Sequence, residues 1–178
     1  MLPGFNAEWV WRQVSSTPRP SQNLPGVCMR SSLTAIGAVS EYQATFTGSR
    51  SREEMAAQLT AVFPDPVTAA TASDVLMTWQ KDCATYARVD LNKTRVTVSE
   101  PVDVPTDAGA GVAWLATYGP VVGDPHAVWF VAEGFVRDGD TLTYLVMQNA
   151  GQDYNYEPGQ TPLELALRVA AERLVKSR

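Results

Sequence analysis

The sequence is poor in the residues that most catalytic and metal-binding sites use. Its 178 residues include one histidine, His126, and two cysteines, Cys28 and Cys83. A zinc site needs more soft ligands than this, and a Ser or Cys nucleophile normally needs a base within hydrogen-bond reach. No Cys-x-x-Cys, Gly-x-Ser-x-Gly or Gly-x-x-x-x-Gly-Lys pattern occurs. We therefore expect no metal, no cofactor and no enzymatic activity, with His126 a loop residue.

Long hydrophobic runs and clusters of positive charge are also missing. The longest apolar run covers 127–132, whereas a membrane-spanning helix needs about 20 apolar residues. The net charge is −5 and the basic residues are dispersed, which argues against nucleic acid or an anionic membrane surface as a partner. No signal-peptide pattern follows Met1. We expect the chain to be a segment excised from a longer exported protein.

What is present fits one domain covering 1–178, because 45% of the residues are apolar and five are tryptophan. Stretches rich in β-branched and aromatic residues predict strands. We place these strands at 8–16, 42–47, 94–98, 111–118, 128–136 and 142–148. Asp138-Gly139 between the last two predicts a hairpin with a type I′ turn.

Residues 51–63 allow two interpretations. Ser51-x-x-Glu54 has the pattern of a helix capping box, yet the alternation through Phe63 into Pro64 is typical of a strand. We favour a strand from about 55 to 63.

Two main helices are predicted from their start signals, besides a short one at 31–38 that ends at Gly37. Asp65 is an N-cap before Pro66, and a stripe at spacings of three and four leads through Trp79 to Cys83. We expect Trp79 to be a core residue. The last helix starts at Thr161-Pro162, with Glu164 completing a capping box. The predicted fold class is α+β, with a twisted antiparallel β-sheet and the two main helices packed on one face.

Aromatic and amide side chains gather at neighbouring strand ends and in the loop before the last helix. This composition is typical of a small-ligand or carbohydrate site, although each aromatic residue could equally be an ordinary core residue. The candidate ligand-binding residues are Trp129, Glu133, Tyr144, Gln148, Asn149, Gln152, Asp153, Tyr154 and Tyr156.

Glu133 is the natural acid for a rival function, because it lies within an apolar strand. Paired with Asp153 or Glu157, it could serve a small hydrolase of envelope carbohydrate. We favour a Glu133 side chain that faces water on an open side of the sheet. A third hypothesis is a structural module whose open sheet face docks a protein.

Several features in order resemble a known family. They are Trp9 and Trp11, Cys28 before Leu33-x-x-Ile36-Gly37-Ala38, the Phe63-Pro64-Asp65 step, Trp79 just before Cys83, and a last helix ending Ala171-x-Arg173-Leu174. In this order the chain resembles the extracellular sensor domains typified by that of the mycobacterial serine/threonine kinase PknH, together with related actinobacterial lipoproteins and sensor domain-containing proteins. The resemblance covers nearly the whole chain.

The resemblance implies an α/β domain with a ligand cleft, displayed outside the cell and tethered by a membrane helix or a lipid. From the residues alone, Cys28 and Cys83 could be two buried thiols or one disulfide; the resemblance favours the disulfide. The sensor domain of the kinase PknH carries two disulfides, whereas this chain can make only one. The leading hypothesis is a non-enzymatic sensor module of the cell envelope, working in signal transduction, whose ligand is a small molecule or an envelope component.

Overall fold

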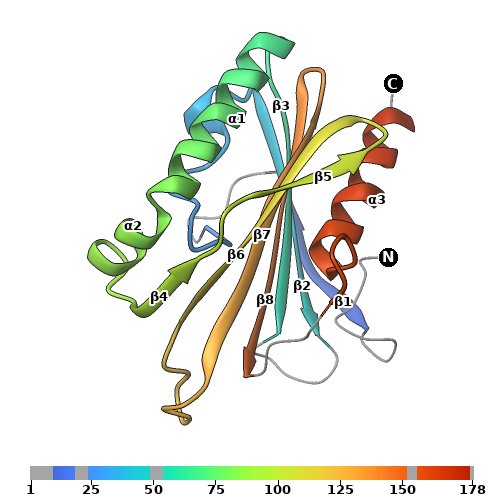
Figure 1. Cartoon of the computed structure of the whole chain (residues 1–178). Coiled ribbons are helices and arrows are strands. Elements are labelled where there is room, and N and C mark those ends of the chain that lie inside the picture. Colours follow the sequence, from blue (N-terminus) through green and yellow to red (C-terminus); the bar gives the residue numbers. More distant parts are fainter. Residues whose placement is uncertain (1–9, 19–23, 49–53, 152–155, 177–178) are drawn as a thin grey trace.

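The computed structural model describes residues 10–18, 24–48, 54–151 and 156–176. Its centre is a twisted eight-stranded sheet in which every described pairing is antiparallel (Figure 1). The strand order is β1(Trp11–Thr17), β2(Ser40–Gly48), β3(Met55–Val62), β8(Thr141–Gly151), β7(Val128–Asp138), β6(Gly109–Gly119) and β4(Thr94–Val98). A further strand, β5(Val102–Thr106), also pairs with β6. The predicted α+β class with a twisted antiparallel sheet is confirmed.

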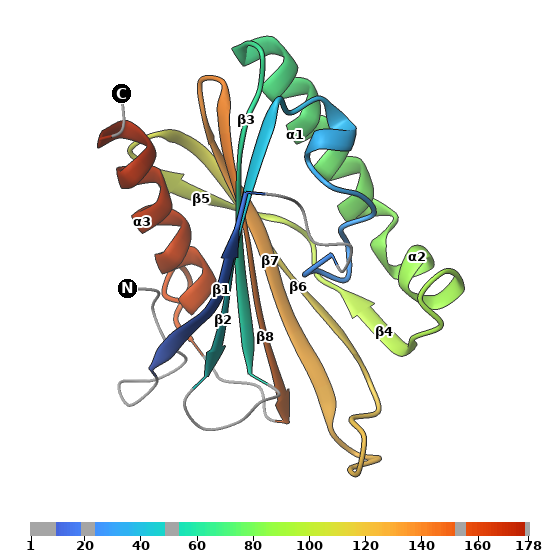
Figure 2. The ribbon, with the colours of Figure 1, turned by 180° about the vertical axis from the view of Figure 1, so that it is seen from behind.

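Helices cover both faces of this sheet. Helices α1(Pro66–Lys81) and α2(Cys83–Val89) lie on one face, and α3(Pro162–Lys176) lies on the other (Figures 1 and 2). This corrects the expectation that the two main helices share a face. We call the two sides the α1 face and the α3 face.

The reason lies in the central strands. Residues 142–147 of β8 are all buried, with Tyr144 and Val146 in the core under α1, and Leu145 and Met147 in the core under α3. A strand that is apolar on both sides must be covered on both sides. An antiparallel sheet with one open face would instead have shown alternation of apolar and polar residues.

The expected helix starts are present in atomic detail. The Asp65 carboxylate accepts a hydrogen bond from the Thr68 backbone N–H at 2.8 Å, with Pro66 as the first helical residue. At α3, the Glu164 carboxylate accepts from the Thr161 N–H at 2.9 Å, while the Thr161 hydroxyl accepts from the Glu164 N–H at 3.2 Å. Trp79 is partly buried and packs against the core under α1.

Three local features differ from the sequence expectations. The helix predicted to reach Cys83 ends at Lys81, and Cys83 begins a separate helix, α2. Strand β5 was not predicted, because Pro105 lies inside it; proline is tolerated there since β5 pairs on one side only, with β6. The β7–β8 turn consists of Gly139 and Asp140, and only Gly139 has positive φ, which fits a type II′ turn better than type I′.

The ambiguous segment is resolved as a strand. β3 runs over Met55–Val62 and pairs with β2 on one side and β8 on the other, so the favoured interpretation is confirmed. The alternation of 58–63 suits a strand, and pairing with a neighbour on each side stabilises that strand. In the described part of the chain, none of the helices combines the length and the apolar character required to cross a bilayer.

Candidate functional site

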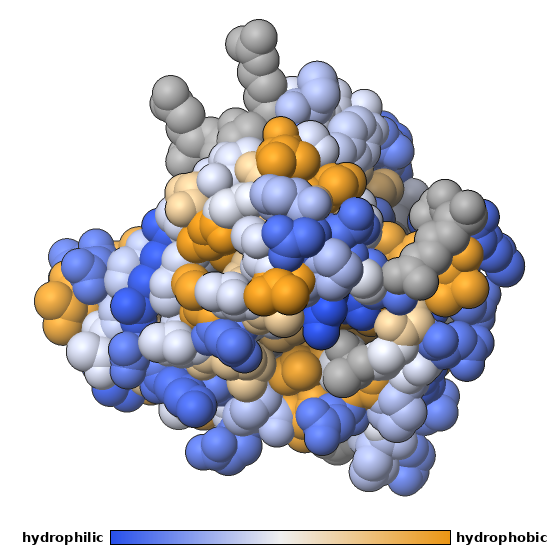
Figure 3. Space-filling view, turned by 90° about the horizontal axis from the view of Figure 1, so that it is seen from above, coloured by the Kyte–Doolittle hydropathy of each residue, from blue (hydrophilic) through white to orange (hydrophobic). Residues whose placement is uncertain are grey.

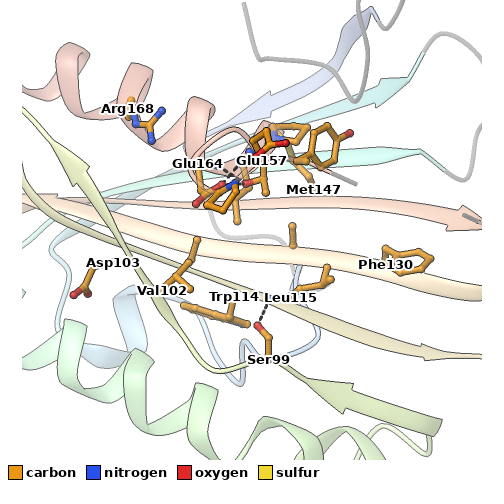
Figure 4. Close-up of a pocket in the computed structure, with 18 of the residues that line it drawn as sticks. Ser99, Val102, Asp103, Trp114, Leu115, Phe130, Met147, Glu157, Glu164 and Arg168 are labelled. Carbon is orange, nitrogen blue, oxygen red and sulfur yellow. Dashed lines mark hydrogen bonds between the residues drawn. The ribbon is translucent and has the colours of Figure 1, made fainter. Parts of the chain in front are cut away.

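A cavity of about 580 Å³ opens on the α3 face, between the start of α3 and the sheet (Figure 4). This is within the range of about 300–1,000 Å³ that small-molecule sites occupy. Its walls and floor are mainly apolar: Val102 and Pro105 of β5, Ala113, Leu115, Phe130, Ala132 and Met147 of the central strands, Pro158 before α3 and Leu163 in the first turn of α3. We call it the α3 cavity.

Strand β5 and the segment before it shape one side of the α3 cavity. The Ser99 hydroxyl accepts a hydrogen bond from the Leu115 backbone N–H at 3.0 Å, which ties this segment to β6 (Figure 4). Beyond it, β5 packs against α3 as well as pairing with β6. The unpredicted strand is therefore one wall of the cavity.

The polar group that points to a ligand is Asn149. The residue is 6% exposed and lines the α3 cavity, and no described residue hydrogen bonds to its carboxamide. The carboxamide has two donor hydrogens and an acceptor oxygen to offer a molecule in the cavity. A ligand with a carbonyl, hydroxyl or amide group would satisfy it.

Charged side chains surround this apolar space. Arg168 of α3, Asp103 of β5 and Glu157 line the cavity, and within the described ranges none of them forms a salt bridge. Glu164 also lines it, but its carboxylate is used in capping α3.

Glu133 lies on the other side of the sheet and is fully buried, at 0% exposure. Its carboxylate accepts hydrogen bonds from the backbone N–H groups of Val27 at 2.8 Å and Cys28 at 3.0 Å, and from the Tyr144 hydroxyl. Burial raises the pKa of Glu133, and these hydrogen bonds oppose that rise. Burial and the neighbouring carboxylate raise the pKa of Tyr144 well above its usual value. The expectation that Glu133 faces water is wrong, because both faces of the sheet are covered.

Of the two carboxylate pairs proposed for a hydrolase, Glu133 and Glu157 are not brought together. Glu133 is sealed on the α1 face beneath Gly26, where an added Cβ would lie 2.1 Å from its Oε2. Glu157 lines the cavity on the α3 face, and Asp153 lies outside the described residues. A retaining or inverting glycosidase needs both carboxyl groups at one cleft. No observation on these residues favours the hydrolase.

A second cavity, of about 420 Å³, lies on the α1 face. It is an open hollow bounded by residues 24–29, by α2 and the turn after it, and by β6 and β8. We call it the α1 cavity. Tyr118 of β6 lines it and stacks on Trp129, with ring centroids 6.3 Å apart, and the Lys93 ammonium lies 4.6 Å from the centroid of the Tyr118 ring.

The predicted ligand-binding residues are thus divided between the two faces. Asn149 and Tyr156 line the α3 cavity, whereas Gln148 lines the α1 cavity and Trp129 lies beside it. Tyr144 and Glu133 are buried on the α1 face, where they hydrogen bond to each other. Gln152, Asp153 and Tyr154 fall outside the described residues.

Sequence reasoning did not anticipate that Phe130, Asp103 and Arg168 line the α3 cavity. A signal existed for Arg168, because it lies next to the buried Leu167 in an otherwise apolar helix face. No local signal existed for Asp103, since its strand was not predicted.

The structure contains the disulfide Cys28–Cys83, whose cysteines are 55 residues apart in the sequence. The Trp114 indole N–H donates to the Cys28 sulfur at 3.3 Å. The disulfide joins the segment held by Glu133 to the first residue of α2. The pairing implied by the family resemblance is therefore present.

Comparison with known proteins relates this fold to a sensor domain. No protein-family profile matches the chain, and no curated protein matches its sequence. Among solved structures, the crystal structure of the extracellular domain of PknH from Mycobacterium tuberculosis is similar, with a TM-score of 0.60 and 13% identity, covering 92% of this chain and 85% of that chain. At this identity the similarity establishes the fold alone. The chain has a sensor-domain-like fold.

Proposed function

We propose that this chain is a non-enzymatic, extracytoplasmic ligand-binding module of the sensor type, and that the α3 cavity is its ligand site. The observation that carries the proposal is that the Asn149 carboxamide lines an apolar cavity and makes no hydrogen bond to another described residue. An apolar pocket with one or a few oriented polar groups is the usual composition of a small-molecule site.

Export is supported by two further observations. The disulfide Cys28–Cys83 is the kind of bond that persists in oxidising compartments. The fold is shared with a domain described as extracellular. We infer display at the cell envelope, with a tether supplied by a part of the protein beyond this chain, and a ligand that is a small molecule or an envelope component.

A neutral, apolar fluorescent probe tests the α3 cavity directly. N-phenyl-1-naphthylamine is small enough for a space of about 580 Å³ and fluoresces when it leaves water. We expect saturable binding to the wild-type chain. Ala132→Trp, which adds an indole to the cavity floor, should abolish binding, and Asn149→Leu should change the affinity.

The neighbouring residue supplies the matched control. Gln148 precedes Asn149 on β8 and faces the opposite cavity, so Gln148→Leu should leave probe binding unchanged. Near-UV circular dichroism would show that each variant is folded. No binding to the wild-type chain, or equal binding to Ala132→Trp, would overturn the proposal.

A further inference from the structure

The α1 cavity is built from three parts of the chain that are fastened to one another. Residues 24–29 form one wall, and α2 with the following turn forms a second, which includes Tyr86 and Lys93. The sheet contributes Tyr118 and Gln148. This space lies on the opposite face of the sheet from the α3 cavity, so it does not depend on the proposed function of that cavity.

Two buried links hold these walls in place. The disulfide joins Cys28, in the first wall, to Cys83, the first residue of α2. The Glu133 carboxylate holds the backbone N–H groups of Val27 and Cys28 to β7. A wall that is fixed before a ligand arrives loses little conformational entropy on binding. The cavity is therefore pre-organised.

One charged side chain lines the α1 cavity among the described residues. Among the described residues that line it, Lys93 alone is charged, and its ammonium has no carboxylate within 4 Å in the described part of the chain. It rests over the ring of Tyr118, which holds it in position without neutralising it. An ammonium group has three N–H donors, so Lys93 can still bind an anion.

The remaining lining suits a flat organic group. Tyr86 and Tyr118 offer ring faces, Leu24 and Leu91 offer apolar contact, and the Gln148 amide can hydrogen bond at the sheet. Burial, with the Glu133 charge as a second cause, raises the pKa of Tyr118, so its hydroxyl remains a donor at neutral pH.

We propose that the α1 cavity is a second binding site, for a small planar organic acid whose carboxylate pairs with Lys93 and whose ring lies against Tyr118. The α3 cavity differs in charge, because Asp103 and Glu157 line it together with Arg168. Gln148 and Asn149 are consecutive residues of β8 and line opposite cavities. The two sites therefore lie back to back across one strand and differ in the ligands they accept.

Three probes separate charge from shape: benzoate, its neutral isostere benzamide, and inorganic phosphate. In ¹H–¹⁵N spectra of the isotopically labelled chain, benzoate should shift the Gln148 side-chain amide and the Trp129 indole signals saturably. Benzamide should bind roughly tenfold more weakly, which is about 1.4 kcal/mol, because it lacks the negative charge that pairs with the Lys93 ammonium. Phosphate has no ring to pack and should leave these signals in place.

The decisive variant is Lys93→Met, with Lys81→Met as its control. Lys81 is an exposed lysine at the end of α1 that does not line the cavity. Lys93→Met should remove the preference for benzoate over benzamide, while Lys81→Met keeps it. If benzoate causes no saturable shift at Gln148 and Trp129, or if Lys93→Met binds it as well as the wild-type chain, the proposal fails. Phosphate binding as strong as that of benzoate would overturn the planar-acid assignment.

Discussion

At the scale of single residues, Glu133 carries the largest structural consequence. A buried carboxylate is unfavourable unless its oxygens are satisfied, and here two backbone N–H groups and the Tyr144 hydroxyl donate to it. The residue that could have been a catalytic acid is instead an anchor for the wall of the α1 cavity.

Two substitutions of Glu133 separate the stability that its hydrogen bonds contribute from the effect of its charge. Glu133→Ala leaves three buried donors without an acceptor, each costing about 1–3 kcal/mol, so we expect a loss of at least about 3 kcal/mol in the free energy of unfolding. Glu133→Gln keeps a side-chain oxygen that can accept from the Val27 and Cys28 backbone N–H groups, so this variant should lose much less stability. Urea denaturation of the three proteins at one pH measures both differences. An alanine variant as stable as the wild type would show that the anchor is not needed.

The pH dependence of the same variants tests the charge itself. Because burial raises the pKa of Glu133, the folded state binds this proton more tightly than the unfolded state does. The contribution of Glu133 to stability is therefore fully present below the usual carboxyl pKa and is lost as pH rises through the raised folded pKa. The difference in the free energy of unfolding between the wild type and Glu133→Gln should show this decline as pH rises. Glu41, whose pKa is also raised by burial, is present in both proteins, so its contribution cancels in this difference.

At the scale of elements, the helix starts were encoded locally and strand β5 was not. The caps at Asp65 and Thr161 formed as their spacing indicated, because a cap involves residues three positions apart. Strand β5 depends on a partner, β6, and on α3 packing against it. Pro105 disfavours a strand at this position, so strand propensity did not predict β5.

The disulfide is the covalent link between two elements, and its removal should be measurable. We expect neither cysteine to react with an alkylating reagent in urea until a reductant is added, as read by intact mass. Reduction should then lower the free energy of unfolding by about 4 kcal/mol, because the bond closes a loop of 55 residues in the unfolded chain. Free alkylation of both cysteines without reductant would contradict the disulfide and weaken the case for export.

At the scale of the whole molecule, one sheet serves two cores and two cavities. Strands β7 and β8 contribute side chains both to the core under α1 and to the core under α3. Viewed from above, hydrophobic residues on the surface are interspersed with hydrophilic ones and form no single broad patch on that side (Figure 3). The docking hypothesis requires an open sheet face, whereas helices pack on both faces of this sheet (Figures 1 and 2).

Because the two cores share strands, neither should unfold alone. We expect thermal unfolding to be a single transition, with far-UV and near-UV circular dichroism giving the same midpoint. The coincidence tests the prediction that 1–178 forms one domain. Two separate midpoints would instead mean that the α1 side and the α3 side are independent units.

What the sequence determined by itself was local: the helix starts at Asp65 and Thr161, the strands other than β5, and the α+β class. Each follows from neighbours a few residues apart, through capping geometry or a periodicity of two or 3.6. The side of the sheet on which each helix lies, the burial of Glu133 and the separation of Gln148 from Asn149 were decided only by tertiary structure. Consecutive strand residues point to opposite faces, so a list of adjacent binding residues becomes two sites once both faces are covered.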